Sequence, residues 1–156
     1  MSTIITHPNS ILRQKAVELR LEEIPKIQEL IYDMQETMSE KDGIGLAANQ
    51  IGILKRIVVI ADKEGPLILI NPEIIEKSWL KNIMEEGCLS VPGVFGTVKR
   101  HKKITVAAIN SRGETLKLKA EGMLARVIQH EIDHLDGILF IDKVIKYTEG
   151  EPPKST

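Results

Sequence analysis

The sequence has a single cysteine, few aromatic side chains and no long apolar run. One cysteine excludes an internal disulfide framework and fits a reducing compartment. Aromatic residues make up only 3% of the chain, so we expect a core of Ile, Leu and Val. No apolar run approaches the roughly 20 residues that span a membrane, and the first residues show neither a secretory nor a transit-peptide pattern. We therefore expect a cytoplasmic protein.

The chain also lacks an excess of charge of either sign. Its 21 basic and 22 acidic residues give a formal net charge of -1, so we predict neither direct nucleic-acid binding nor an anionic membrane as partner. A length of 156 residues is sufficient for one domain with a proper core. We expect a single domain over residues 1–156, with a short polar tail at 142–156.

The apolar pattern predicts one long amphipathic helix and several strands. Aliphatic and Met side chains recur at helical spacing from Ile24 to Met38. Short β-branched or aliphatic runs at 56–61, 67–70, 104–109 and 115–119 are separated by turn-forming residues. Strands joined by short turns pair antiparallel, so the pattern predicts an α+β fold.

The segment Gln129-His130-Glu131-Ile132-Asp133-His134 carries the strongest chemical signal. On a helix, His130 and His134 lie one turn apart on one face, where two imidazoles can bind the same metal ion. Glu131 lies beside them and can take a proton from a water molecule. Helical periodicity places an apolar face next to this histidine stripe and a polar arc of Arg126, Gln129, Asp133 and Asp136 opposite, with Gly122 and Gly137 as the helix limits.

An open catalytic metal site needs a third protein ligand. Glu149 and Glu151 lie downstream in a polar segment without helical periodicity, so they are weak choices. Cys88 lies in Glu86-Gly87-Cys88-Leu89-Ser90 and is the only cysteine, so its thiolate is the better choice. A lone cysteine is more often a small buried apolar residue, and that alternative stays open on the local sequence.

The segment from Gly43 to Gly52 is rich in glycine and small residues, so its backbone can come very close to a neighbouring element. It could be a tight loop on a core helix or a strand edge that pairs with an extended peptide. On the local sequence alone the loop is favoured. Gln50 is its one side chain able to donate a directed hydrogen bond.

Three motifs together resemble those of the peptide deformylases. They are Gly43-Ile44-Gly45-Leu46-Ala47-Ala48-Asn49-Gln50, Glu86-Gly87-Cys88-Leu89-Ser90 and Gln129-His130-Glu131-Ile132-Asp133-His134. Their order and separations also match the family. The resemblance implies antiparallel sheets packed around a central helix, and hydrolytic removal of the N-formyl group from nascent polypeptides that begin with formylmethionine.

For the site, the resemblance implies one divalent metal bound by Cys88, His130 and His134. Iron(II) is expected in the cell, and zinc, nickel or cobalt also suit these ligands. Glu131 is expected to carry the proton. Gln50 and the main-chain N–H of Leu89 are expected to donate to the oxyanion.

For the substrate, the resemblance implies that main-chain groups of Ile44 and Gly45 pair with an extended peptide. Met84, Val127 and the stem of Arg126 are expected to line a pocket for the methionine side chain. Arg100 is expected near the exit of the peptide, with a solvated surface charge as the alternative. We expect a monomer that acts on nascent chains at the ribosome.

Two other functions share part of this pattern. A zincin-type metallopeptidase has H-E-x-x-H but takes its third ligand downstream. A non-catalytic structural site would be closed by a fourth protein ligand, which His7 or His101 would have to supply.

Overall fold

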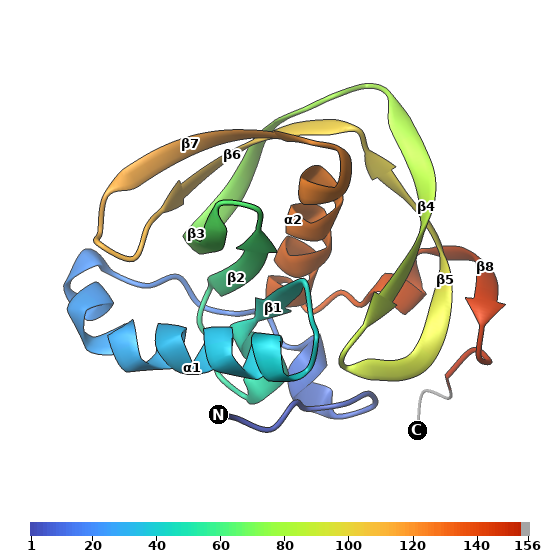
Figure 1. Cartoon of the computed structure of the whole chain (residues 1–156), viewed down its shortest axis with the longest axis horizontal. Coiled ribbons are helices and arrows are strands. Elements are labelled where there is room, and N and C mark those ends of the chain that lie inside the picture. The colour runs from blue at the N-terminus through green and yellow to red at the C-terminus, as the bar shows by residue number, and fades with distance from the viewer. Residues whose placement is uncertain (154–156) are drawn as a thin grey trace.

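The computed structural model describes residues 1–153, in which two antiparallel sheets surround helix α2 (Figure 1). The predicted α+β fold is confirmed. One sheet has the strand order β1-β2-β3-β6-β7 and the other has the order β4-β5-β8. The elements in chain order are η1 (Ser10–Arg13), η2 (Leu21–Ile27), α1 (Gln28–Glu40), β1 (Gly45–Ala47), η3 (Ala48–Ile51), β2 (Ile57–Asp62), β3 (Gly65–Lys77), β4 (Lys81–Cys88), β5 (Val91–His101), β6 (Lys103–Ile109), β7 (Thr115–Glu121), α2 (Gly122–Leu135), η4 (Phe140–Asp142) and β8 (Val144–Glu149), where η marks a 3₁₀ helix.

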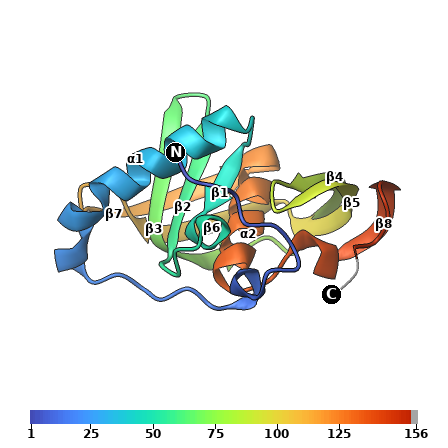
Figure 2. The same cartoon turned by 90° about the horizontal axis from the view of Figure 1, so that it is seen from below.

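The first four residues of β2, Ile57 to Ile60, are apolar and buried on both faces of the sheet. Successive side chains point to opposite faces of a sheet. Ile57 and Val59 therefore pack with α1, whereas Val58 and Ile60 pack with α2. Figure 2 shows α1 across one side of this sheet, with β4, β5 and β8 beyond α2. The sheet thus fixes α2 from one side and the three-stranded sheet encloses it from the other.

Helix α2 begins and ends where the sequence predicts, at Gly122 and before Gly137. Gly137 has φ +77°, a left-handed conformation that favours glycine. A Cβ at this position would lie 2.5 Å from the carbonyl oxygen of Arg13. The buried guanidinium of Arg56 also donates to the carbonyl oxygen of Leu135 (3.1 Å) and so satisfies a terminal carbonyl of the helix.

One predicted boundary is wrong. The helix expected from Ile24 starts at Gln28, after a 3₁₀ segment that contains Pro25. Part of the predicted polar tail forms β8, which pairs with β5. Val144 of β8 packs against a small apolar cluster that includes Val98 of β5 and Phe140. The remainder of that tail includes residues 154–156, which lie outside the described residues. Within residues 1–153, no helix is both long and apolar enough to cross a membrane.

The Gly137 contact gives a test of how α2 is terminated. We expect Gly137→Ala to lower the free energy of unfolding by more than Gly113→Ala does. Both variants force alanine into a left-handed conformation, which costs roughly 1–2 kcal/mol. Only Gly137 also meets backbone, because the nearest atom to a Cβ at Gly113 is 4.0 Å away. Denaturant unfolding measures the difference, and equal losses would contradict the assigned contact.

Candidate active site and metal centre

Both histidines of α2 are buried, with 8% of His130 and 1% of His134 exposed. The predicted polar face of this helix is wrong, because Arg126 and Gln129 are also buried. Gln129 Oε1 accepts a hydrogen bond from the N–H of His101 (3.0 Å), and its Nε2 donates to the carbonyl oxygen of the same residue (2.9 Å). The three-stranded sheet covers that face and forms hydrogen bonds with its polar side chains. Helical periodicity identifies these side chains as polar but cannot show that a sheet buries them.

The end of β4 places Cys88 against the two histidines. The possible ligand atoms of Cys88, His130 and His134 all lie within 4.8 Å of one another. Cys88 Sγ lies 3.2 Å from His134 Nε2. One thiolate and two imidazoles suit a borderline-soft divalent metal such as zinc or iron(II). The three residues therefore fit the metal ion that the motif predicts. Within residues 1–153, no other cluster of three possible metal ligands is found.

Glu86 orients the first histidine. Its Oε1 lies 2.9 Å from His130 Nδ1, which leaves Nε2 to face Cys88. This is the usual carboxylate partner behind a metal-binding imidazole. Sequence reasoning gave Glu86 no role, although it lies two residues before the cysteine in the same motif.

Glu86 is buried together with two arginines. Arg100 donates from Nε to Oε2 (3.0 Å) and from Nη2 to Oε1 (2.9 Å), and Arg126 also donates to Oε2. Burial by itself would raise the pKa of Glu86. The hydrogen bonds from His130 and Arg100 outweigh it and hold the pKa well below its usual range. The carboxylate is therefore a fixed negative charge behind His130.

The prediction that Arg100 meets the substrate is wrong, and so is the alternative of a solvated charge. Only 3% of Arg100 is exposed, and it does not line the cavity described below. Besides Glu86, it bonds Asp133 of α2, which in turn lies 2.8 Å from Lys143 Nζ. Arg100 thus joins β4, β5 and α2 beneath the histidines.

The two imidazoles differ in their charge. Burial would lower the pKa of His130, but Cys88, Glu86 and Glu131 together raise it to about 10. Burial and the nearby charge of His130 instead lower the pKa of His134 well below its usual value. A metal requires two neutral imidazoles, so its binding must displace the proton that His130 otherwise holds.

Glu131 has the environment of a proton carrier. Only 4% of the residue is exposed, and its Oε1 has no hydrogen-bond partner within residues 1–153. Burial, the largest influence, raises its pKa to about 7. The backbone of β1 comes very close, because a Cβ on Gly45 would lie 2.7 Å from Glu131 Oε2. This approach explains why the segment needs glycine here.

Gln50 and Leu89 lie on either side of the cysteine. Gln50 Nε2 lies 3.1 Å from Ser90 Oγ and 3.6 Å from Cys88 Sγ, and its Oε1 accepts from the N–H of Ala47 (2.9 Å). The side-chain amide is thus fixed at its oxygen and aims its two hydrogens at the site. Leu89 follows Cys88 in the turn to β5 and lines the same cavity.

A cavity of about 440 Å³ opens above these groups. It brings together most of the predicted substrate residues, namely Ile44, Gly45, Arg126 and Val127. Met84 is not among the residues that line it, and its contact with the substrate stays a prediction. Met84 is 38% exposed on β4. Sequence reasoning missed several lining residues: Asp42, Glu85, Gly93, Phe95 and Met123. Met123 could have been found, because it shares the direction of His130 on α2.

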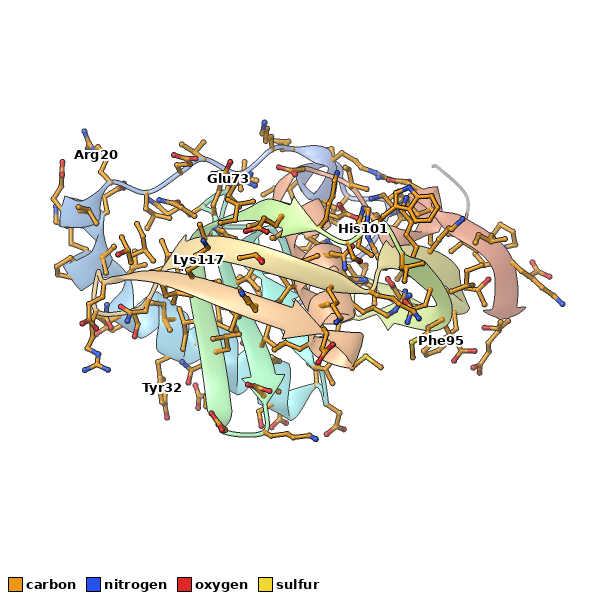
Figure 3. The ribbon with its side chains drawn as sticks, turned by 90° about the horizontal axis from the view of Figure 1, so that it is seen from above. Arg20, Tyr32, Glu73, Phe95, His101 and Lys117 are labelled. Carbon is orange, nitrogen blue, oxygen red and sulfur yellow. The ribbon has the colours of Figure 1, made fainter. Side chains whose placement is uncertain are left out.

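The competing ligands lie elsewhere. His101 is the last residue of β5, and its Nδ1 lies 2.7 Å from the carbonyl oxygen of Ser78. Figure 3 shows it apart from Phe95, which lines the cavity. Neither His7 nor His101 joins the cluster of Cys88 and the two histidines. Glu149 lies exposed on β8 and does not line the cavity. Within residues 1–153 there is therefore neither the fourth ligand of a closed site nor the downstream ligand of a zincin.

Comparison with known proteins gives the same assignment. Residues 1–149 match the polypeptide deformylase family. Peptide deformylase from Halothermothrix orenii is 53% identical over 141 residues, which cover 89% of this chain and 90% of that relative. Peptide deformylase 1 from Bacillus subtilis is 48% identical over 151 residues, covering 95% and 93% of the two chains.

Solved structures agree in fold. The crystal structure of peptide deformylase from Thermotoga maritima superposes with a TM-score of 0.88 at 42% identity, covering 92% of this chain and 97% of that chain. A peptide deformylase from Synechococcus elongatus in complex with actinonin gives 0.87 at 41% identity, covering 92% and 78%. By its motifs, its sequence relatives and its fold, the chain belongs to the polypeptide deformylase family.

Proposed function

We propose that this chain hydrolyses the N-formyl group of polypeptides that begin with formylmethionine, releasing formate and a free amine. The observation that carries the proposal is the unpartnered carboxylate of Glu131 beside Cys88, His130 and His134, at the base of a cavity that a β-strand edge borders. Family membership supplies the formyl substrate.

Cys88, His130 and His134 would hold one divalent metal, which when bound supplies Lewis acidity and lowers the pKa of the attacking water. Glu86 keeps His130 in the orientation that presents Nε2. Three protein ligands leave a position open, as a catalytic site requires.

Glu131 moves the proton. Its unpartnered Oε1 accepts a proton from water as the oxygen attacks the formyl carbon, and the carboxyl group then returns that proton to the departing nitrogen. A pKa near 7 suits both steps, because neither protonation state is strongly favoured.

Gln50 and Leu89 would stabilise the charge that develops on the formyl oxygen. Gln50 Nε2 contacts Ser90 Oγ and Cys88 Sγ, and the longer contact, 3.6 Å to Cys88 Sγ, is the one that an oxyanion would replace. The bond to Ser90 can persist, and with the Ala47 bond it keeps the amide aimed. The main-chain N–H of Leu89 is the second donor.

The substrate backbone would extend along Ile44 and Gly45 as an added strand. The cavity beside Val127, Met123 and the stem of Arg126 would take the methionine side chain. We further propose that the protein works as a monomer in the cytoplasm, on nascent chains at the ribosome, and that iron(II) is its cellular metal.

The first prediction tests the reaction and its proton carrier together. Holoenzyme should release formate from a formyl-methionyl peptide and should not release acetate from the acetylated peptide. Glu131→Gln should retain a comparable metal content but lose turnover by orders of magnitude, because Gln cannot accept the proton. A metal-depleted Glu131→Gln protein would make Glu131 a ligand and would refute the proposed role.

The same variant also has a stability readout in the metal-free protein. The pKa of Glu131 is raised from 4.5 to about 7 on folding, so ionisation disfavours the folded metal-free protein as pH rises through that range. At pH 8 the free energy of unfolding of Glu131→Gln should therefore be higher than that of wild type, by roughly 3 kcal/mol. The advantage should vanish at pH 4, where Glu131 is protonated in both states.

A second prediction concerns the oxyanion. Gln50→Leu removes the donor at similar size and should lower kcat by about 10² to 10³ while changing KM little. Steady-state kinetics with a formyl-methionyl peptide measures both. A change confined to KM would show that Gln50 only binds the substrate.

A third prediction concerns the metal. Protein prepared without oxygen should contain iron(II) and lose activity in air, because oxygen oxidises the ion and peroxide oxidises Cys88. Nickel- or cobalt-loaded protein should stay active. Metal analysis and deformylation rates on anaerobic, aerobic and nickel-loaded preparations test this, and an equally fast and durable zinc form would contradict the iron assignment.

A further inference from the structure

The connection between β3 and β4, residues 78–80, exposes the only tryptophan of the chain. Trp79 is 93% exposed, and Leu80 beside it is 60% exposed. A tryptophan side chain has one of the largest apolar surfaces and is usually well packed. Figure 1 shows this connection near the top of the view, away from both termini. The structure around Trp79 therefore needs an explanation that packing does not give.

The connection is fixed to the junction between β5 and β6. The N–H of Ser78 donates to the carbonyl oxygen of Lys103 (2.8 Å), and Ser78 Oγ accepts from the N–H of Lys103 (3.1 Å). The same hydroxyl donates to the carbonyl oxygen of Leu80 (2.7 Å), which also accepts from the N–H of Lys102 (3.0 Å). Trp79 is thus held out from the surface by a turn that does not have to become ordered when a partner binds.

Exposed lysines surround this tryptophan. They lie on each side of the connection and at the β5–β6 junction: Lys77, Lys81, Lys99, Lys102 and Lys103. Residues 77–84 and 99–104 contain no Asp or Glu. Within residues 1–153, only Lys103 of the five forms an ion pair, with Glu121 (3.7 Å). The balanced net charge of the whole chain, from which no nucleic-acid partner is expected, averages over this local excess of positive charge.

A hollow of about 480 Å³ adjoins the connection. The ends of β3, β6 and β7 form it, and its lining is polar at most positions. Lys77, Ser78, Lys103 and Lys119 supply donors, whereas Glu76 and Glu121 supply acceptors. A ribose carries a 2′-hydroxyl that both donates and accepts, so this lining suits a ribonucleotide.

An exposed aromatic ring among lysines is the arrangement that binds single-stranded nucleic acid, because bases stack on the ring while the cations meet phosphates. An anionic bilayer would also attract lysines. A flat bilayer, however, could contact only the projecting side chains and would leave the polar hollow unused. A flexible strand can cover Trp79, the lysines and the hollow together. The shape and the charge of this face therefore favour a single strand.

We propose that this face binds single-stranded RNA, with an unpaired base stacked on Trp79 and the neighbouring phosphates bound by the surrounding lysines. Every base has a face that can stack on indole, so we expect little sequence preference. Neither Trp79 nor any of the five lysines lines the active-site cavity. The RNA-binding face is therefore independent of the proposed hydrolysis.

The experiment titrates the holoenzyme with an oligouridylate of about 10 nucleotides. It follows the fluorescence of Trp79, which has no other tryptophan to obscure it. Stacking should quench this fluorescence. Three or four phosphate contacts should make the affinity fall by about 20-fold to 50-fold between about 50 and 200 mM salt. No quenching at low salt would overturn the proposal.

Two pairs of variants locate the contacts, with the anisotropy of a labelled oligouridylate as the readout. Trp79→Ala should weaken binding by about tenfold, and Trp79→Phe should recover most of the loss because it keeps a ring. Lys81→Gln should weaken binding and reduce the salt slope by about 0.7. Lys63→Gln removes the same charge from the exposed turn between β2 and β3 and should change neither. Equal effects of the two lysine variants would mean a general field and would overturn the assignment to this face.

Two other ligands separate the alternatives. Inorganic polyphosphate carries the charges without bases, so Trp79→Ala should not weaken its binding. An equal loss for polyphosphate and RNA would overturn the stacking. A blue shift of Trp79 fluorescence with vesicles of phosphatidylcholine and phosphatidylglycerol, without a response to RNA, would identify a bilayer as the partner and overturn the proposal.

Deformylation of a free formyl-methionyl peptide by Trp79→Ala should equal that of wild type. Absence of RNA binding in an active holoenzyme would overturn this proposal alone. RNA binding by a protein that releases no formate would overturn the proposed function and leave the RNA-binding face standing.

Discussion

The site depends on a buried carboxylate, Glu86, that is held ionised beneath the first histidine. A buried charge is costly unless it is paired and fully hydrogen-bonded. Here Arg100, Arg126 and His130 satisfy Glu86 from three directions. Because these partners come from β5 and α2 while Glu86 comes from β4, one charge cluster fixes the sheet and the helix that carry Cys88, His130 and His134.

The second constraint is the close approach of backbone to α2. Gly45 lets β1 lie directly on Glu131, with no room for a side chain between them. Glu131, the proposed proton carrier, is thereby kept out of bulk water, which raises its pKa. The edge of the sheet, formed by β1, lies beside it. The burial that raises the pKa of Glu131 also disfavours its ionised form in the folded protein. The proposed catalytic role therefore lowers the free energy of unfolding above the raised pKa.

Much of this could be predicted from sequence. The strands 56–61, 67–70, 104–109 and 115–119 carry strong β-branched or aliphatic runs, and the H-E-x-x-H spacing alone places two imidazoles on one helix face. Strand β4 gave no such signal, because Lys81–Cys88 mixes polar and apolar residues and only one of its residues is buried. The role of Arg100 was missed for a different reason. Its partners lie 14 and 33 residues away in sequence, and a charged residue gives no local sign that it is buried.

X-ray absorption spectroscopy at the edge of the bound metal in active holoenzyme tests the metal site most directly. We expect one sulfur and two imidazole nitrogens around the metal, with the remaining coordination from exchangeable oxygen. The sulfur contribution should disappear in Cys88→Ala. A shell of nitrogen and oxygen alone in the wild-type protein, or three imidazoles, would contradict the site of Cys88, His130 and His134.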